Sequence, residues 1–274
     1  MSTISAALAA ARKRIEASEA RLLLRRLLDC SAAHIAGHGD SPIDASIAEA
    51  FSDLVERRRA GEPIAYLTGA REFYGRVFSI GPGVLIPRPE TELLIDVVLA
   101  KIDIDAAVRV LDMGTGSGCL AITLALELPK ARVMATDTSS AAIEIARNNS
   151  VRLGVCDRFR LVESDWFSAF TDECFDVIVS NPPYIANGDT HLASGDLRFE
   201  PRAALASGDD GLDAIRSIVA GAGRHLARGG LLLIEHGYDQ ARPVAGLLAA
   251  HGFTGIKQHR DIAGILRVSA ARLG

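Results

Sequence analysis

The sequence contains few cysteines, and they are far apart. Cys30, Cys119, Cys156 and Cys174 are the only four in 274 residues, and none of them forms a C-x-x-C pair. This spacing disfavours a zinc site or a disulfide framework and fits a reducing cytoplasm. The seven histidines show no metal-ligand spacing, so we predict no metal site. Cys119 and Cys174 have apolar neighbours, which predicts two small core residues.

The chain also lacks long apolar runs and an excess of basic charge. No apolar run reaches about 18 residues, so no transmembrane helix is expected and no membrane partner is predicted. The net charge is −4, which gives no general attraction to nucleic acid. Hydrophobic residues make up 49% of the chain, enough for a sizeable core in one large domain or in a domain with a smaller one.

Residues 1–70 are predicted to form a small helical domain. Apolar side chains recur at near-helical spacing over residues 8–28 and 47–55, separated by a loop at 37–42. Gly61 and Pro63 end the second helical segment. The region contains no constellation of catalytic side chains, so we predict that it docks the substrate.

Residues 71–89 are predicted to be a β-hairpin linker, with Gly75 at a tight turn. Pro87 and Pro89 hold Arg88 in an extended loop. A guanidinium held in this way can position a carboxylate or a substrate backbone, but a plain interdomain turn explains Arg88 equally well. Thr91 is expected to cap the helix that follows.

From residue 108 the sequence alternates between β and α patterns, which predicts an α/β fold with helices on both faces of a parallel sheet. Seven short runs are candidate strands: 108–113, 132–136, 158–162, 175–180, 230–235, 256–259 and 264–270. The last two are expected to close the sheet as an antiparallel pair. We therefore assign residues 90–274 to one Rossmann-like domain, mostly parallel, with an antiparallel last strand.

A glycine loop, Gly114-Thr115-Gly116-Ser117-Gly118, follows the first strand and opens a helix. Its glycines let the backbone approach a ligand, and the helix N-terminus supplies N–H donors. Asp137 ends the next strand about 20 residues on, where a carboxylate can accept from ribose hydroxyls. The pattern predicts a nucleotide-type site without choosing the cofactor, because residues 116–121 also fit a dehydrogenase variant.

Asp112, just before the loop, favours S-adenosylmethionine as the cofactor. Its carboxylate suits a sulfonium and an ammonium and would repel a pyrophosphate. Trp166, the only tryptophan, can pack on adenine, while Asp165 beside it accepts from the adenine amino group. Asp112 and Trp166 each have an alternative role that is only structural. Asp112 can be a carboxylate that caps the turn, and Trp166 can be a core side chain.

The fourth strand ends in Asn181-Pro182-Pro183-Tyr184. The two prolines end the ladder and hold Asn181 at the carboxyl end of the sheet, where open α/β folds bind ligands. The Asn181 side-chain oxygen and the Pro182 carbonyl can each accept one N–H of a planar NH2 group, and Tyr184 can pack against its plane. An Asn-Pro turn is common by itself, but the whole motif downstream of a glycine loop is more specific.

Several motifs resemble known families. Residues 110–118 resemble the first motif of class I S-adenosylmethionine-dependent methyltransferases, and residues 181–184 resemble their amino-group-methylating subset. Three further motifs point to a narrower family than these two: Ile86-Pro87-Arg88-Pro89-Glu90-Thr91-Glu92, residues 199–202 and residues 208–212. With these, essentially the whole chain resembles the protein-(glutamine-N5) methyltransferases of peptide chain release factors.

The resemblance implies an enzyme that methylates the glutamine of the Gly-Gly-Gln motif of a release factor and yields S-adenosylhomocysteine. It implies that Gly114 to Gly118 hold the methionine part of the cofactor, Asp137 the ribose and Trp166 the adenine region. Asn181 would contact cofactor and substrate, and Pro182, Pro183 and Tyr184 would hold the substrate glutamine. Alternatives are an adenine-N6 methyltransferase, disfavoured by the charge, a non-catalytic binding module, and a dehydrogenase.

Overall fold

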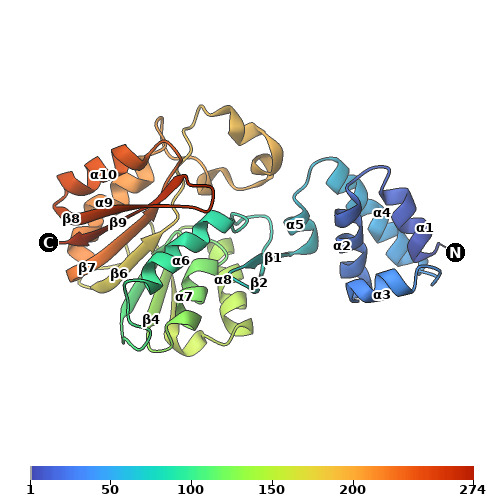
Figure 1. Cartoon of the computed structure of the whole chain (residues 1–274), viewed down its shortest axis with the longest axis horizontal. Helices are drawn as coiled ribbons and strands as arrows, with labels where there is room; N and C mark the ends of the chain where they lie inside the picture. The colour runs from blue at the N-terminus through green and yellow to red at the C-terminus, as the bar shows by residue number, and fades with distance from the viewer. Residues whose placement is uncertain (1) are drawn as a thin grey trace. The chain divides into compact units, whose positions relative to one another are not determined.

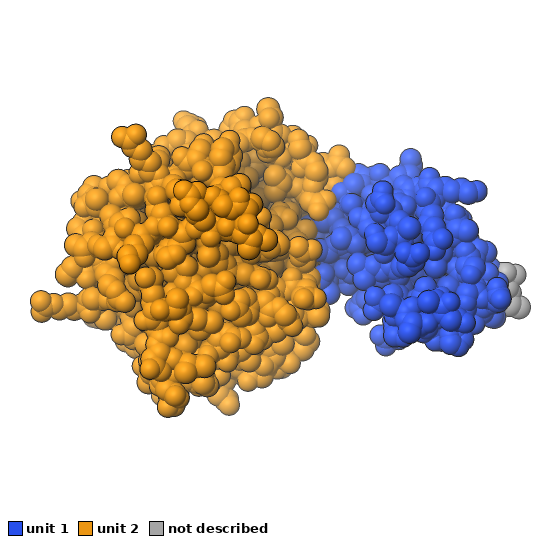
Figure 2. Space-filling view, viewed as in Figure 1, with its two compact units in different colours: residues 1–70 blue, residues 71–274 orange. Residues whose placement is uncertain are grey.

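The computed structural model describes residues 2–274, and the chain divides into two compact units. Unit 1 extends to Ala70 and unit 2 begins at Arg71 (Figure 2). Unit 1 consists of five helices: α1 (Ile4–Ala11), α2 (Ala17–Leu28), α3 (Ala32–Gly37), α4 (Ala45–Arg59) and α5 (Ile64–Thr68). Leu23, Leu24, Phe51 and Val55 lie in its buried core. The predicted helical character of this part is confirmed.

A two-stranded hairpin starts at the last residue of unit 1 and lies otherwise in unit 2; its strands are β1 (Ala70–Phe73) and β2 (Arg76–Ser79). Its turn residues, Tyr74 and Gly75, both have positive φ, at 51° and 70°. Such turns match the twist of the flanking strands, and glycine adopts them without strain. The predicted hairpin is thereby confirmed.

The loop after the hairpin leads into η1 (Pro89–Thr91) and α6 (Glu92–Leu99). The prediction that Thr91 caps this helix is wrong in one respect. Thr91 occupies the cap position, but within residues 2–274 its side chain makes no capping hydrogen bond. The preceding 3-10 turn places Thr91 in helical backbone, so its hydroxyl points elsewhere and accepts from Asn181 Nδ2 at 2.9 Å.

Seven strands form one sheet in unit 2, in the order β5-β4-β3-β6-β7-β9-β8 (Figure 1). Their bounds are β3 (Arg109–Met113), β4 (Arg132–Asp137), β5 (Phe159–Glu163), β6 (Phe175–Ser180), β7 (Leu226–Glu235), β8 (Phe253–Arg260) and β9 (Leu266–Leu273). The neighbours from β5 to β7 pair in parallel, and β9 runs antiparallel between β7 and β8. The mostly parallel sheet with an antiparallel last strand is confirmed.

Helices cover both faces of this sheet (Figure 1). Val110 and Val177 pack on one side with α6 and α7 (Cys119–Glu127). Their chain neighbours Leu111 and Ile178 point to the other side, toward α9 (Asp213–His225) and α10 (Ala241–Ala250). Successive strand side chains alternate between faces, so an all-apolar strand buries both. The remaining long helix is α8 (Ser140–Arg152), which follows β4.

Two details differ from the sequence prediction. Helix α9 was not predicted, because Gly221 and Gly223 weaken its helical pattern. Gly221 is needed there, since a Cβ would overlap the ring of Phe167. Cys119 is buried as expected, but Cys174 is exposed, since it lies in the turn before β6 and its apolar neighbours belong to the strand.

Candidate active site

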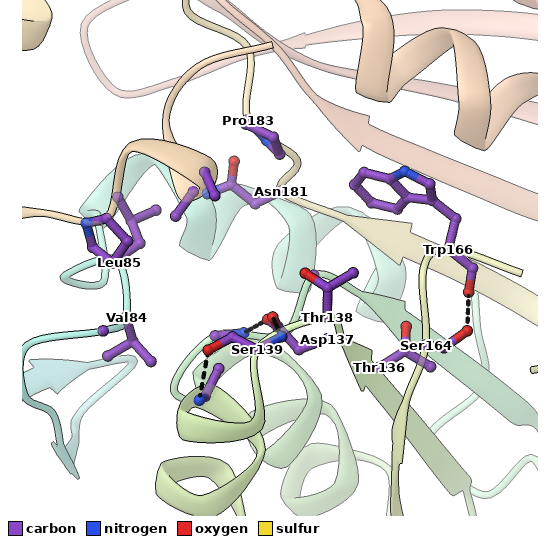
Figure 3. A pocket seen from close by; sticks show the side chains of 17 residues that line it. Val84, Leu85, Thr136, Asp137, Thr138, Ser139, Ser164, Trp166, Asn181 and Pro183 are labelled. Atoms are coloured by element: carbon purple, nitrogen blue, oxygen red, sulfur yellow. Dashed lines mark hydrogen bonds between the residues drawn. The ribbon is translucent and has the colours of Figure 1, made fainter. Parts of the chain in front are cut away.

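A cavity of about 290 Å³ opens at the carboxyl ends of the parallel strands (Figure 3). Gly114 and Gly116 of the glycine loop line it, together with the residues that follow β4, β5 and β6. The loop at 83–85 and the segment at 201–204 complete its wall. Ligands of open α/β sheets bind at this edge, so the cavity is the candidate cofactor site.

The glycine loop has the backbone that its sequence requires. Gly114, Gly116 and Gly118 have φ of 73°, 55° and 79°, a region that favours glycine. The N–H groups of Gly114 and Thr115 both donate to Thr136 O at 2.9 Å, which joins the loop to the end of β4. Gly118 serves packing, because a Cβ there would come within 2.9 Å of Ile122 Cδ1 and 3.0 Å of Ala146 Cβ.

Asp137 lines the cavity and is fixed by two backbone donors. Its Oδ2 accepts from Gly116 N and its Oδ1 from Ser139 N, both at 2.9 Å. A carboxylate oxygen has two lone pairs, so each oxygen retains one for a ligand hydroxyl. Ser139 also caps α8 by accepting from Ala142 N (Figure 3).

Asp165 and Trp166, which follow β5, have different surroundings in the structure. Trp166 adopts a left-handed backbone, with φ of 47°, and its ring lines the cavity (Figure 3). Ser164 Oγ donates to Trp166 O at 2.9 Å and stabilises this turn. Asp165 is exposed to solvent, outside the cavity lining, and its predicted contact with adenine stays a prediction.

A second, smaller cavity of about 40 Å³ adjoins the first and shares Leu85, Gly114, Gly116 and Asn181 with it. Asp112, Thr115 and Ser117 contribute polar atoms to its wall. Asp112 is 1% exposed and accepts from Thr115 Oγ1 at 2.6 Å. Burial raises the pKa of Asp112 to about 7, and the nearby charge of Asp137 adds to this rise.

Asn181 lies between the two cavities. Its Nδ2 donates to Thr91 Oγ1 at 2.9 Å, and within residues 2–274 no hydrogen bond occupies its Oδ1 acceptor. Pro183 lines the larger cavity, whereas Pro182 is buried. Tyr184 packs against the core cluster on the α9 side, and its hydroxyl donates to Glu235 Oε1 at 3.4 Å. The predicted packing of Tyr184 on a substrate amide stays a prediction.

Comparison with known proteins identifies the family. The family model for the PrmC N-terminal domain matches residues 1–69, and the methyltransferase small domain matches 89–208. A release factor glutamine methyltransferase from Burkholderia pseudomallei is 51% identical, over 94% of this chain and 93% of its own. One from Xylella fastidiosa is 46% identical, over 97% of both. The chain belongs to the release factor glutamine methyltransferase family.

Solved structures agree with the fold. A methyltransferase from Pyrococcus furiosus matches with a TM-score of 0.56 and 21% identity, over 81% of this chain and 99% of its own. The human Mettl16 catalytic domain matches with a TM-score of 0.60 and 16% identity, over 87% and 84%. These confirm the methyltransferase fold. In the part of the chain that the structure describes, no helix has the length and apolar character needed to span a membrane.

Two family-like motifs that are far apart in the sequence meet at Arg88. Its guanidinium pairs with Oε1 of Glu200, and Ile86 N donates to Oε2 of the same carboxylate at 3.1 Å. The Glu200 side chain is fully covered, and burial raises its pKa although Arg88 opposes the rise. Arg88 therefore positions a carboxylate of its own chain and ties the loop before α6 to the segment beside the larger cavity.

The raised pKa of Asp112 predicts a pH-dependent stability. Its folded-state pKa of about 7 exceeds the ordinary 3.8, so the folded protein keeps a proton that the unfolded chain releases between these values. The free energy of unfolding should therefore fall as pH rises through this window. Asp112→Asn should remove on the order of 2 kcal/mol of this fall.

Urea unfolding of the wild type and of Asp112→Asn at pH 5 and pH 8 measures the effect. Glu235 contributes to the same trend, because burial also raises its pKa to about 7. Some slope should therefore persist in the variant. An identical slope in both proteins would show that Asp112 ionises normally in the folded state.

Proposed function

We propose that this protein transfers a methyl group from S-adenosylmethionine to the side-chain amide nitrogen of the glutamine in the Gly-Gly-Gln motif of peptide chain release factors. The observation that carries the proposal is Asn181, held between two cavities with its side-chain oxygen free to accept. The names of the relatives supply the substrate. The cysteines are free where the structure describes them, which fits the proposed place of the reaction in the cytoplasm.

The residues around the larger cavity fit the cofactor. Gly114 and Gly116 bring backbone close to the ligand, Asp137 can accept from ribose hydroxyls, and Trp166 offers a flat apolar face for adenine. Asp112 in the adjoining cavity suits the positive charge of the methionine part. The volume of about 290 Å³ is near the lower end of the range for ligand sites, roughly 300 Å³.

When bound, S-adenosylmethionine supplies an electrophilic methyl group. The chain then needs mainly to orient the weakly nucleophilic amide nitrogen in line with it. We propose that Asn181 Oδ1 and the Pro182 carbonyl each accept one N–H of the substrate amide. Acceptors placed there oppose amide resonance as positive charge develops on the nitrogen, so they act most strongly in the transition state.

Cofactor binding should depend on Asp137. We expect Asp137→Ala to weaken the affinity for S-adenosylmethionine by about 1–3 kcal/mol through lost ribose hydrogen bonds. Calorimetry measures the affinity, and thermal unfolding checks that the variant stays folded, because Gly116 N and Ser139 N each lose their acceptor. Asp157→Ala is the matched control, because Asp157 is an exposed carboxylate in η2 (Cys156–Arg158). Unchanged affinity in a folded Asp137→Ala variant would contradict the proposal that Asp137 binds the ribose hydroxyls.

A labelling experiment tests the substrate class. The protein is incubated with methyl-labelled S-adenosylmethionine and either a release factor or DNA. Label on the release factor alone is the expected result. Label on DNA alone would instead indicate an adenine-N6 methyltransferase, which also requires acceptors for a planar amino group.

A further inference from the structure

A fully buried asparagine in α8 joins two segments that form walls of the candidate cofactor site. Asn149 is 0% exposed, whereas its chain neighbour Asn148 is exposed. A buried amide destabilises a fold unless its donors and acceptors have partners. Asn149 lies outside the glycine loop and the Asn-Pro-Pro-Tyr motif, and it lines neither cavity. What it does must therefore follow from the groups that it binds.

Every hydrogen-bonding position of the Asn149 amide is occupied. Its Nδ2 donates to Ser79 O and to Ser117 O, both at 2.9 Å. Its Oδ1 accepts from Ser79 N at 2.8 Å and from Arg152 Nη2 at 3.1 Å. An amide has two donor hydrogens and two acceptor lone pairs, so these four bonds use its full capacity. The side chain is thereby held in one orientation.

The two bonds to Ser79 anchor the segment that leads to the larger cavity. Ser79 is the last residue of β2, and Asn149 binds both its N–H and its C=O, as a residue of a neighbouring strand would. Val84 and Leu85 follow shortly after Ser79 and line the larger cavity (Figure 3). Asn149 therefore fixes the point from which this wall of the cavity starts.

The remaining donor of Asn149 holds a peptide group of the glycine loop. Gly116 and Gly118 flank Ser117, and both have positive φ, so glycine's conformational freedom surrounds this peptide. Gly118 N donates to Thr115 O at 2.9 Å, while Asn149 binds the Ser117 carbonyl at the other end of the same peptide group. The peptide group between Ser117 and Gly118 is thus fixed at both ends.

This fixed peptide group belongs to the wall of the smaller cavity. Ser117 lines that cavity together with Asp112, and Ser117 Oγ has no hydrogen-bond partner among residues 2–274. Rotation of the peptide group would displace the hydroxyl and break the bond between the Ser117 carbonyl and Asn149. A loop that is ordered before its ligand arrives loses less conformational entropy on binding, which raises the affinity.

We propose that Asn149 is a positioning residue for the cofactor: it fixes the glycine loop and the start of the segment that leads to residues 83–85, and so raises the affinity for S-adenosylmethionine. This inference rests on the proposed function for the identity of the cofactor. Because Asn149 lines neither cavity, its loss should weaken cofactor binding and leave the rate at saturating cofactor nearly unchanged.

The first test compares Asn149→Ala with two control variants. Asn148→Ala removes an exposed amide from the same helix, and Leu248→Ala destabilises the buried core at α10, away from both cavities. Calorimetry should show a Kd for S-adenosylmethionine that is about tenfold higher or more in Asn149→Ala alone. Its kcat at saturating cofactor should stay within about twofold of the wild type. An equal rise of Kd in Leu248→Ala would show that the effect is only a loss of stability.

Asn149→Asp tests the same role with a side chain of the same shape. An ionised aspartate still accepts from Ser79 N and from Arg152, whose charge offsets its own, but it donates to neither carbonyl. We expect Kd for S-adenosylmethionine to rise as in Asn149→Ala, because the bond to Ser117 is lost in both. Normal affinity in the folded aspartate variant would contradict the proposal. If neither variant folds, Asn149 is a structural residue and the positioning role is wrong.

Hydrogen exchange without any ligand separates this inference from the proposed function. Relative to the amides of β6, those of residues 114–118 should exchange several-fold faster in Asn149→Ala than in Leu248→Ala, because only the first change releases the loop. If this occurs but the wild type binds no S-adenosylmethionine, the proposed function fails and the loop-fixing role of Asn149 stands. If the wild type binds the cofactor and Asn149→Ala keeps both the affinity and the slow exchange, the positioning role is wrong.

Discussion

Replacing Asn181 with alanine should reduce methyl transfer to a release factor by roughly 10²-fold or more, as loss of an oriented acceptor commonly does. The side chain lies where the two cavities meet, and Thr91 fixes its nitrogen so that its oxygen remains for the substrate. Alanine removes that acceptor at the point where positive charge develops. The fold should tolerate the change, because it loses one hydrogen bond, about 1 kcal/mol.

The matched control is Asn187→Ala. Asn187 is exposed and its contacts are made by its backbone, which donates to Gly208 O and accepts from Arg202. Initial rates for the wild type and both variants, at saturating cofactor and release factor, measure kcat directly. Near-normal turnover in Asn181→Ala would show that this residue serves only to end β6.

Removing unit 1 should raise KM for the intact release factor by about tenfold or more while sparing cofactor binding. One glutamine side chain in a small pocket contributes little binding affinity, so contacts away from the reacting group must supply much of the affinity for the substrate. Unit 1 has its own buried core, and the lining of both cavities comes from unit 2. We therefore propose that it docks the release factor.

The variant for this test begins at Arg71, because a cut between Ile64 and Thr68 would break α5, where Ala65, Tyr66 and Leu67 are buried. Calorimetry with S-adenosylmethionine checks that the shortened protein is folded. A short peptide that contains Gly-Gly-Gln is the matched substrate, since its kcat/KM should change little. Unchanged KM for the intact factor would refute the docking role, and lost cofactor binding would show that the two units fold together.

The sheet and its ligand edge were predictable because their signals are local. Apolar runs such as 175–180 mark strands that are buried on both faces, and the polar residue after each run lies at the carboxyl edge. Asp137 and Asn181 follow from this rule, and both line the larger cavity. The same rule predicts that Asp165 lies at the ligand edge. In the structure, the left-handed turn at Trp166 places the indole ring at the cavity and leaves Asp165 in solvent.

The supporting contacts were not predictable from local patterns. Arg88 and Glu200 are 112 residues apart in the sequence, and Asn181 and Thr91 are 90 apart. Each pair depends on how the loop before α6 meets another part of unit 2, the segment at Glu200 in one case and the end of β6 in the other. In the sequence Glu235 is only the end of a strand, and its contact with the Tyr184 hydroxyl comes from another part of the chain.

The most direct test of the central claim is to locate the methyl group. The protein is incubated with S-adenosylmethionine and a release factor, and the factor is digested and mapped by tandem mass spectrometry. The proposed function predicts one added methyl group on the side chain of the Gly-Gly-Gln glutamine, and none when that glutamine is replaced by alanine. Methylation of another residue, or methylation that persists in the alanine variant, would contradict it.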